Sequence, residues 1–140
     1  MKKVVFACVH NAGRSQMAAA WLNHLARRHD SLSTLRPTTE PPTAISAGTE
    51  PAERVHPEVV EVMKEVGIDL SSATPQKLTT DLARDAQLLV TMGCGDNCPY
   101  VPGLEVEDWP LEDPKGKSIE RVREIRDEIR SRVEALLDRP

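Results

Sequence analysis

The sequence of 140 residues fits a single domain covering residues 1–140 and is too short for two domains of ordinary size. Its 39% hydrophobic and 29% charged residues are typical of a folded globular protein, while its net charge of −4 and its 3% aromatic content argue against nucleic acid as a partner. No stretch approaches the roughly 18 apolar residues of a membrane span, and the apolar run at the N-terminus is too short for a signal peptide, so we expect a cytoplasmic protein.

The first half of the chain is predicted to alternate strands and helices. Pro57 fits the first turn of a helix because its ring fixes a helical φ, and Gly67 fits the position just past the end of that helix. The prolines between 31 and 43 favour a surface loop. In chain order we predict a strand at 3–7, a helix from Ser15, the loop at 31–43, a strand at 44–48 and a helix at 57–66.

The second half continues this alternation. An apolar run predicts a strand at 88–92, residues 104–106 are a weaker candidate, and a long amphipathic helix is predicted at 118–137. The apolar stripe of that helix consists of Ile119, Val122, Ile125, Ile129, Val133 and Leu136. Its expected surface ion pairs are Arg123–Asp127 and Glu128–Arg132. Strands alternating with helices predict an α/β fold, with a parallel sheet covered on both faces.

Reactive side chains follow several of the predicted strands. Cys8 comes directly after the first strand, Cys94 follows the strand at 88–92, and Asp113 follows the weak strand at 104–106. Because parallel strands end at the same edge of a sheet, and ligands bind beyond that edge, we expect these residues to lie close together.

The segment from Cys8 to Ser15 has the order of an oxyanion-binding loop: a cysteine, five residues, Arg14 and Ser15, set between a strand and a helix. Backbone N–H groups, a helix N-terminus and the Arg14 fork can together bind an anion, and the same field favours a Cys8 thiolate. Ser15 can donate its hydroxyl to that sulfur. The alternative is an inert buried cysteine beside a surface arginine. The predicted oxyanion-binding residues are Val9, His10, Asn11, Ala12, Gly13 and Arg14.

Cys94 and Cys98 lie on a segment rich in turn-forming residues. Three cysteines without an export signal make a structural disulfide framework improbable. A zinc site would need further ligands, and the four histidines show no ligand-like spacing with this pair. Two unrelated buried thiols are a second alternative. Thiol–disulfide exchange is the reading that we favour, because three thiols suffice for a relay that begins at Cys8.

Asp113, followed by Pro114, is a candidate general acid. A reaction that expels an oxygen leaving group benefits from a proton at the transition state, and a proline stiffens the loop that supplies it. An ordinary aspartate in a turn is the alternative, because Asp-Pro is common in turns.

The run from Cys8 to Ala18 resembles the loop and first helix of the low-molecular-weight tyrosine phosphatase superfamily, and its Ser15–Ala18 part resembles the arsenate reductase branch. The likeness continues through 46–48, 90–92 and 113–114, so it covers essentially the whole chain. It implies a three-layer α/β sandwich in which a four-stranded parallel sheet is flanked by helices.

The resemblance also implies an activity, the reduction of arsenate to arsenite, with phosphate or sulfate as analogues of the substrate. Cys8 would attack arsenate, Asp113 would protonate the departing oxygen, and Cys94 would resolve the adduct. Cys98 would then carry the disulfide to thioredoxin. We expect no cofactor, no metal and no membrane partner, and we expect a monomer.

This sequence departs from the family pattern at three places. The spacer between Cys94 and Cys98 is three residues, which is shorter than in many relatives. The segment 115–117 carries lysines where the phosphatases have tyrosines, which disfavours phosphotyrosine as the substrate. Ala19 stands where some relatives carry an acidic residue that helps to bind potassium, so we expect no potassium site.

Three other functions use the same loop. A phosphatase would hydrolyse a phospho-Cys8 intermediate with water, which leaves Cys94 and Cys98 without a role. A phosphoryl carrier would pass the phosphoryl group to a partner, and a non-catalytic oxyanion sensor would only bind the anion. A carrier would leave Asp113 and both distal cysteines superfluous, and a sensor would not require a cysteine of low pKa for binding alone.

Overall fold

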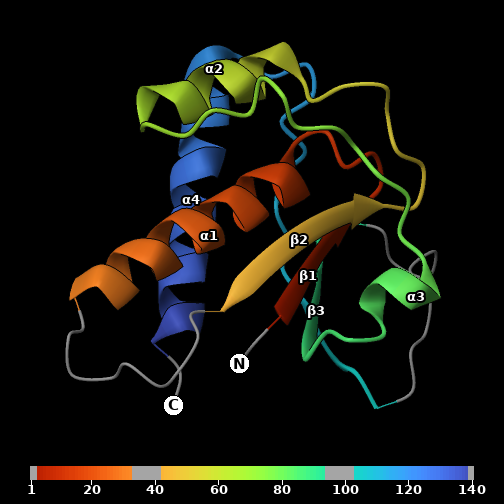
Figure 1. Ribbon diagram of the computed structural model, residues 1–140. Helices are drawn as coiled ribbons and strands as arrows, with labels where there is room; N and C mark the ends of the chain where they lie inside the picture. Colours follow the sequence, from red (N-terminus) through yellow and green to blue (C-terminus); the bar gives the residue numbers. More distant parts are fainter. Residues whose placement is uncertain (1–2, 33–41, 94–102, 139–140) are drawn as a thin grey trace.

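The computed structural model describes residues 3–32, 42–93 and 103–138. The four strands of this part of the chain form one parallel sheet in the order β2-β1-β3-β4, with helices on both faces (Figure 1). The elements in chain order are β1 (Lys3–Cys8), α1 (Arg14–Leu32), β2 (Thr43–Gly48), α2 (Pro57–Glu65), α3 (Thr80–Ala83), β3 (Leu88–Thr91), β4 (Glu105–Asp108) and α4 (Ile119–Leu137). The predicted fold class, a three-layer α/β sandwich, is confirmed.

The side chains of β1 alternate between two hydrophobic cores, as the pleat of a strand requires. Val4 and Phe6 are fully buried in a large core shared with α1, α2 and α4, which cover one face of the sheet (Figure 1). Val5 and Ala7 are fully buried in a smaller core on the other face, beside α3. The strand is therefore apolar at successive positions, because both of its faces are covered.

The strand order places the end of β1 at the centre of the sheet edge. β1 pairs with β2 on one side and with β3 on the other, so Cys8 lies opposite Gly48 and Ala7 lies opposite Thr91. The chain runs from β1 to β2 on one side and then crosses to β3 on the other. Ligands bind at such a switch point in open α/β sheets, and Cys8 is located there.

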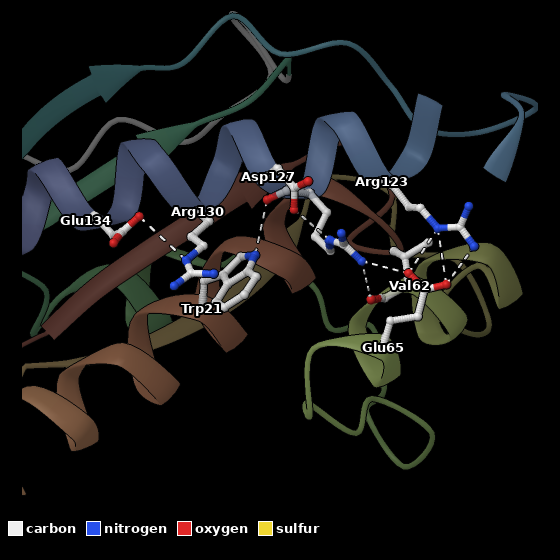
Figure 2. Close-up of polar contacts among 8 residues, drawn as sticks. Trp21, Val62, Glu65, Arg123, Asp127, Arg130 and Glu134 are labelled. Carbon is white, nitrogen blue, oxygen red and sulfur yellow. Dashed lines mark hydrogen bonds and ion pairs between the residues drawn. The ribbon is translucent and has the colours of Figure 1, made fainter. Parts of the chain in front are cut away.

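Polar contacts join α4 to the two helices packed against it (Figure 2). The Trp21 indole of α1 donates to the Arg126 carbonyl at 3.2 Å, and Arg126 donates through Nη1 to the Val62 carbonyl of α2 at 2.9 Å. Arg126 also contacts Glu65 and Asp127, so its buried guanidinium has three acceptors. These bonds tie α1, α2 and α4 into one layer.

Several elements differ from the sequence prediction because tertiary contacts override local pattern. Arg123 pairs with Glu65 of α2 rather than with Asp127, whereas the predicted Glu128–Arg132 pair is present at 3.5 Å. Within α2, the buried side chains are Val59, Val62 and Met63, and Val60 is only partly buried.

Element boundaries also shift. Residues 31 and 32, predicted as loop, belong to α1, and the weak strand at 104–106 is Glu105–Asp108. The helix α3 was not predicted, since four residues are too few for a periodic pattern. The long C-terminal helix is confirmed, and Ser118 caps it by accepting a bond from the Arg121 N–H. Within the described residues, no helix combines the length and the apolar character that crossing a bilayer requires.

Candidate active site

The segment from Cys8 to Arg14 connects β1 to α1 and forms a loop, called here the cradle, whose carbonyl oxygens face outward. The N–H groups of a second loop donate to these carbonyls at 2.8–3.2 Å. The bonds are Thr49 to Cys8, Glu50 to Val9, Ala52 to His10, and His56 to Ala12. Because the N–H and C=O of one peptide point in opposite directions, this arrangement turns the cradle's N–H groups inward. The cradle can therefore receive an oxyanion.

Two glycines allow other segments to approach the cradle closely. A Cβ at Gly48 would lie 2.6 Å from the Val9 carbonyl oxygen, so the end of β2 packs directly on the cradle backbone. A Cβ at Gly13 would lie 2.8 Å from Cγ of Pro114. Gly13 thus accommodates the buried Pro114 and brings the neighbouring Asp113 to the same site.

The Cys8 sulfur lies within hydrogen-bonding distance of the Ser15 hydroxyl. Cys8 is 3% exposed, and its Sγ lies 2.8 Å from Ser15 Oγ. Asn11 Nδ2 also donates to Ser15 Oγ at 2.8 Å. A hydroxyl has one proton, and this one already accepts from Asn11, so its proton is available to the sulfur. The contact places a hydroxyl donor beside the atom that acts as the nucleophile in cysteine chemistry.

The orientation of the Asn11 amide is set by two donors. Asn11 Oδ1 accepts from the Gln76 backbone N–H at 2.9 Å and from Gln16 Nε2 at 3.2 Å. A backbone N–H can only donate, so the Asn11 oxygen must face Gln76 and its nitrogen must face Ser15. Asn11 is fully buried and adopts a left-handed φ of 51°, which asparagine tolerates better than most residues.

Neither Gln16 nor Gln76 was predicted as a site residue. Gln16 adjoins the motif and carries an amide that can reach back to the loop, which is a weak local signal. Gln76 lies 65 residues from Asn11 in the sequence and acts through its backbone, so no pattern of side chains could have indicated it.

Arg14 lies at the mouth of the cradle and contacts the segment that carries Asp113. Its side chain is 11% exposed, its Nη1 donates to the Leu111 carbonyl at 3.0 Å, and its Nη2 lies 3.8 Å from Asp113 Oδ2. Gly93, two residues after the end of β3, has a φ of 94°, and a Cβ there would lie 2.8 Å from Arg14 Nη1. The ends of β1 and β3 and the Asp113 segment therefore meet at this guanidinium.

Asp113 projects from a tight turn. Its Oδ1 accepts from the Lys115 N–H at 3.0 Å, while Oδ2 faces Arg14. The side chain is 48% exposed, so water and substrate can both reach it. The turn holds the carboxyl group beside the cradle, where a general acid for a leaving oxygen has to be.

One histidine belongs to the cradle and a second lies beside it. His10 Nδ1 is 3.1 Å from the Glu50 carbonyl oxygen, and His56, which precedes the first residue of α2, lies near Gly13. His56 was not predicted, and nothing in its local sequence distinguishes it from a surface residue.

Cys94 and Cys98 lie outside the described residues. Of the predicted site residues, the structure brings Cys8, Arg14, Ser15 and Asp113 together with the cradle backbone. Within residues 3–32, 42–93 and 103–138, no three or more His, Cys, Asp or Glu side chains converge as a metal site would require.

Comparison with known proteins places these observations in a family. The family model of "Low molecular weight phosphotyrosine protein phosphatase" matches residues 3–139. A "Putative arsenate reductase" of Halobacterium salinarum is 44% identical over 136 residues, which cover 97% of this chain and 91% of the relative. A "Glutaredoxin arsenate reductase" of Synechocystis sp. is 37% identical over 140 residues, covering 98% and 97%. The solved thioredoxin-dependent arsenate reductase of Corynebacterium glutamicum superposes with a TM-score of 0.76 at 40% identity, covering 97% of this chain and 60% of that one.

Proposed function

Since the chain belongs to the low molecular weight phosphotyrosine protein phosphatase family, we propose that it uses the cradle to reduce arsenate to arsenite. Relatives at 37–44% identity carry the name arsenate reductase. The observation that carries the proposal is the Cys8 sulfur, 2.8 Å from the Ser15 hydroxyl, at the base of a loop whose amides turn inward. That arrangement supplies both an anion site and a nucleophile.

The first chemical step forms a bond between Cys8 and arsenic. Inward N–H groups and the Arg14 guanidinium bind the arsenate oxygens and stabilise the charge that develops on them. The Cys8 thiolate attacks arsenic, one As–O bond breaks, and that oxygen leaves as water with a proton from Asp113. Arsenic remains in its pentavalent state, held to the protein through sulfur.

The second step is the reduction. The roles of Cys94 and Cys98 in it are taken from the sequence analysis. The Cys94 thiolate attacks Cys8 Sγ, an S–S bond forms, and the electron pair of the S–As bond passes to arsenic. Arsenite leaves, and the two electrons come from the two thiolates. Cys98 then attacks Cys94, which frees the Cys8 thiolate and leaves a Cys94–Cys98 disulfide for an external dithiol to reduce.

Thioredoxin is the reductant that we propose, because the matched Corynebacterium glutamicum protein is named for its dependence on it. The Synechocystis relative is named for glutaredoxin, which makes a glutathione-coupled system the alternative. The proposal therefore specifies a three-thiol relay coupled to thioredoxin.

A phosphatase is the second candidate function, since the family itself is named for that activity. The same cradle and Asp113 would form phospho-Cys8, and water would hydrolyse it. The turn after Asp113 carries Lys115, Gly116 and Lys117, so this turn offers no aromatic side chain to pack on a phosphotyrosine ring. We expect weak hydrolysis of small aryl phosphates only.

Arsenate-dependent consumption of NADPH tests the proposal. The wild-type protein is supplied with thioredoxin and its reductase in one assay and with glutathione, glutaredoxin and glutathione reductase in the other. We expect turnover with thioredoxin, none in Cys8→Ser, and loss of turnover but not of aryl phosphate hydrolysis in Cys94→Ser and Cys98→Ser. Turnover of Cys98→Ser at the wild-type rate would contradict the relay.

A further inference from the structure

The segment that carries Asp113 is attached to α4 by an ion pair that belongs neither to the cradle nor to the predicted site. Both carboxylate oxygens of Glu112, the residue before Asp113, accept bonds from Arg121. We propose that Arg121 and Glu112 are positioning residues that hold Asp113 at the cradle during the reaction. This inference rests on the proposed function, because it assigns a role in the step that Asp113 catalyses.

The pair has the geometry of a strong interaction. Arg121 Nε and Nη2 each donate at 3.0 Å to a different oxygen of Glu112, as two parallel bonds. The third nitrogen, Nη1, donates to Glu124 at 2.7 Å, so the guanidinium is fixed from two sides. The Arg121 bonds hold the pKa of the Glu112 carboxyl below its ordinary value. Isolated surface pairs contribute little, but a bidentate pair within a network is the exception.

The pair acts on the part of the segment that packing leaves unrestrained. Leu111 and Pro114 are buried, whereas Glu112 and Asp113 between them are exposed. Adjacent Cα atoms are about 3.8 Å apart, so fixing the Glu112 side chain restricts the rotation of the peptide unit that leads to Asp113. Without the pair, Glu112 would lose its bonds to α4, and Asp113 would depend on its own contacts with Lys115 and Arg14.

Arg121 also differs from the other groups that hold this segment. Arg14 contacts the Leu111 carbonyl and Asp113, but it must also bind the substrate oxyanion. Pro114 packs on Gly13, which is part of the cradle itself. Arg121 comes from α4 and has no role in anion binding. The Lys115 N–H bond to Asp113 and the 4.0 Å contact of Lys117 with Glu112 lie within the turn itself. The Glu112–Arg121 pair is therefore a substrate-independent polar restraint that ties the segment to α4.

The inference predicts a specific kinetic effect of Arg121→Met. The variant should lower kcat about tenfold and leave the KM for arsenate within about twofold, because the cradle amides and Arg14 are unchanged. Complete removal of a general acid typically costs about 10²–10⁴-fold, and the loss here is smaller because Leu111 and Pro114 still hold the segment. Glu112→Gln should behave like Arg121→Met, and Arg121→Lys should recover part of the activity.

A second pair on the same helix supplies a matched control. Arg123 makes bonds of 2.7–3.1 Å to both oxygens of Glu65, and its side chain is 40% exposed against 39% for Arg121. Its partner lies at the end of α2 and not on the segment that carries Asp113. Arg123→Met should thus lower the thermal midpoint at least as much as Arg121→Met while leaving kcat unchanged. This comparison separates positioning from general loss of stability.

The deciding experiment measures kcat, KM and the pH profile of Arg121→Met, Arg123→Met, Asp113→Asn and the Asp113→Asn/Arg121→Met double variant. If Arg121 acts through Asp113, adding Arg121→Met to Asp113→Asn causes no further loss, and both single variants weaken the same acid-dependent limb of the profile. Equal kcat in Arg121→Met and Arg123→Met, or multiplicative losses in the double variant, would overturn the inference.

The same variants are assayed with p-nitrophenyl phosphate, which reacts at the same Cys8. If the wild-type protein hydrolyses this substrate but does not reduce arsenate, the proposed function fails, and the aryl phosphate data still decide the role of Arg121. If Arg121→Met matches wild type in whichever reaction the protein performs, the positioning role is wrong although the function stands. A wild-type protein inactive in both assays overturns both.

Discussion

At the scale of single residues, the direction of the hydrogen bond between Gln76 and Asn11 determines which side-chain donors face Ser15 and Cys8. The Gln76 N–H can only donate, so Asn11 presents its oxygen to Gln76 and its nitrogen to Ser15. The Ser15 hydroxyl accepts from Asn11, so its own proton can be donated to the Cys8 sulfur, 2.8 Å away. Because Cys8 is 3% exposed, its sulfur depends on such protein donors rather than on water for its polar contacts.

Ser15→Ala tests this chain of donors. The variant removes the proton donated to the sulfur and leaves the amide cradle in place, so Cys8 should react with iodoacetamide at pH 7 about tenfold more slowly. The rate is followed by mass spectrometry of the Cys8 peptide, which separates it from Cys94 and Cys98. Phosphate should protect Cys8 in both proteins. An unchanged rate would mean that Ser15 does not stabilise the thiolate.

The sequence predicted those site residues that are adjacent in the chain. Cys8, Arg14 and Ser15 are recognisable because an oxyanion loop between a strand and a helix imposes a fixed local order. Gln76 and Arg121 could not be recognised in this way. Gln76 contributes a backbone N–H, which every residue except proline has, and Arg121 acts on Glu112 from α4 across a gap of nine residues.

At the scale of elements, α4 is joined to α2 by a cluster around Glu65 (Figure 2). The Glu65 carboxylate accepts from Arg123 and from the buried Arg126, which also bonds to the Val62 carbonyl. Local spacing predicted Arg123–Asp127 instead, because i,i+4 neighbours are visible in a sequence and a partner on another helix is not. The cluster joins α4 to α2.

Glu65→Gln should lower stability in a pH-dependent way. Hydrogen bonding from Arg123 holds the pKa of Glu65 below its ordinary value of 4.5. A carboxyl group with a lowered pKa stabilises the folded state above about pH 4.5 and loses that contribution as pH falls through the folded-state pKa. The difference in urea midpoint between wild type and Glu65→Gln should therefore be clear at pH 7 and smaller at pH 3.5.

Glu128→Gln is the control for this effect. Glu128 makes only an exposed i,i+4 pair with Arg132 at 3.5 Å, which should contribute about 0.3–0.5 kcal/mol. Its urea midpoint should stay near that of wild type at both pH values. A Glu65→Gln difference that persists undiminished at pH 3.5 would show that packing, rather than charge, accounts for the loss.

At the scale of the whole molecule, alternating strands and helices predicted the α/β class, while the strand number came from the family resemblance. The strand β4 was only a weak candidate because it is a mostly exposed edge strand, with little hydrophobic pattern. The convergence of Cys8 and Asp113 followed from the geometry of parallel sheets alone. The exact placement of the cradle and of the Asp113 segment depends on close packing at Gly48 and Gly13, which cannot be read from a sequence.

A single turnover without any external reductant tests the central claim most directly. Fully reduced protein is mixed anaerobically with arsenate, and arsenite and protein thiols are then counted. The three-thiol relay predicts one arsenite per protein, a loss of two thiols and a disulfide that maps to Cys94 and Cys98, with none of these in Cys8→Ser. Absence of arsenite from a wild-type protein that still hydrolyses p-nitrophenyl phosphate would contradict the account and identify the chain as a phosphatase.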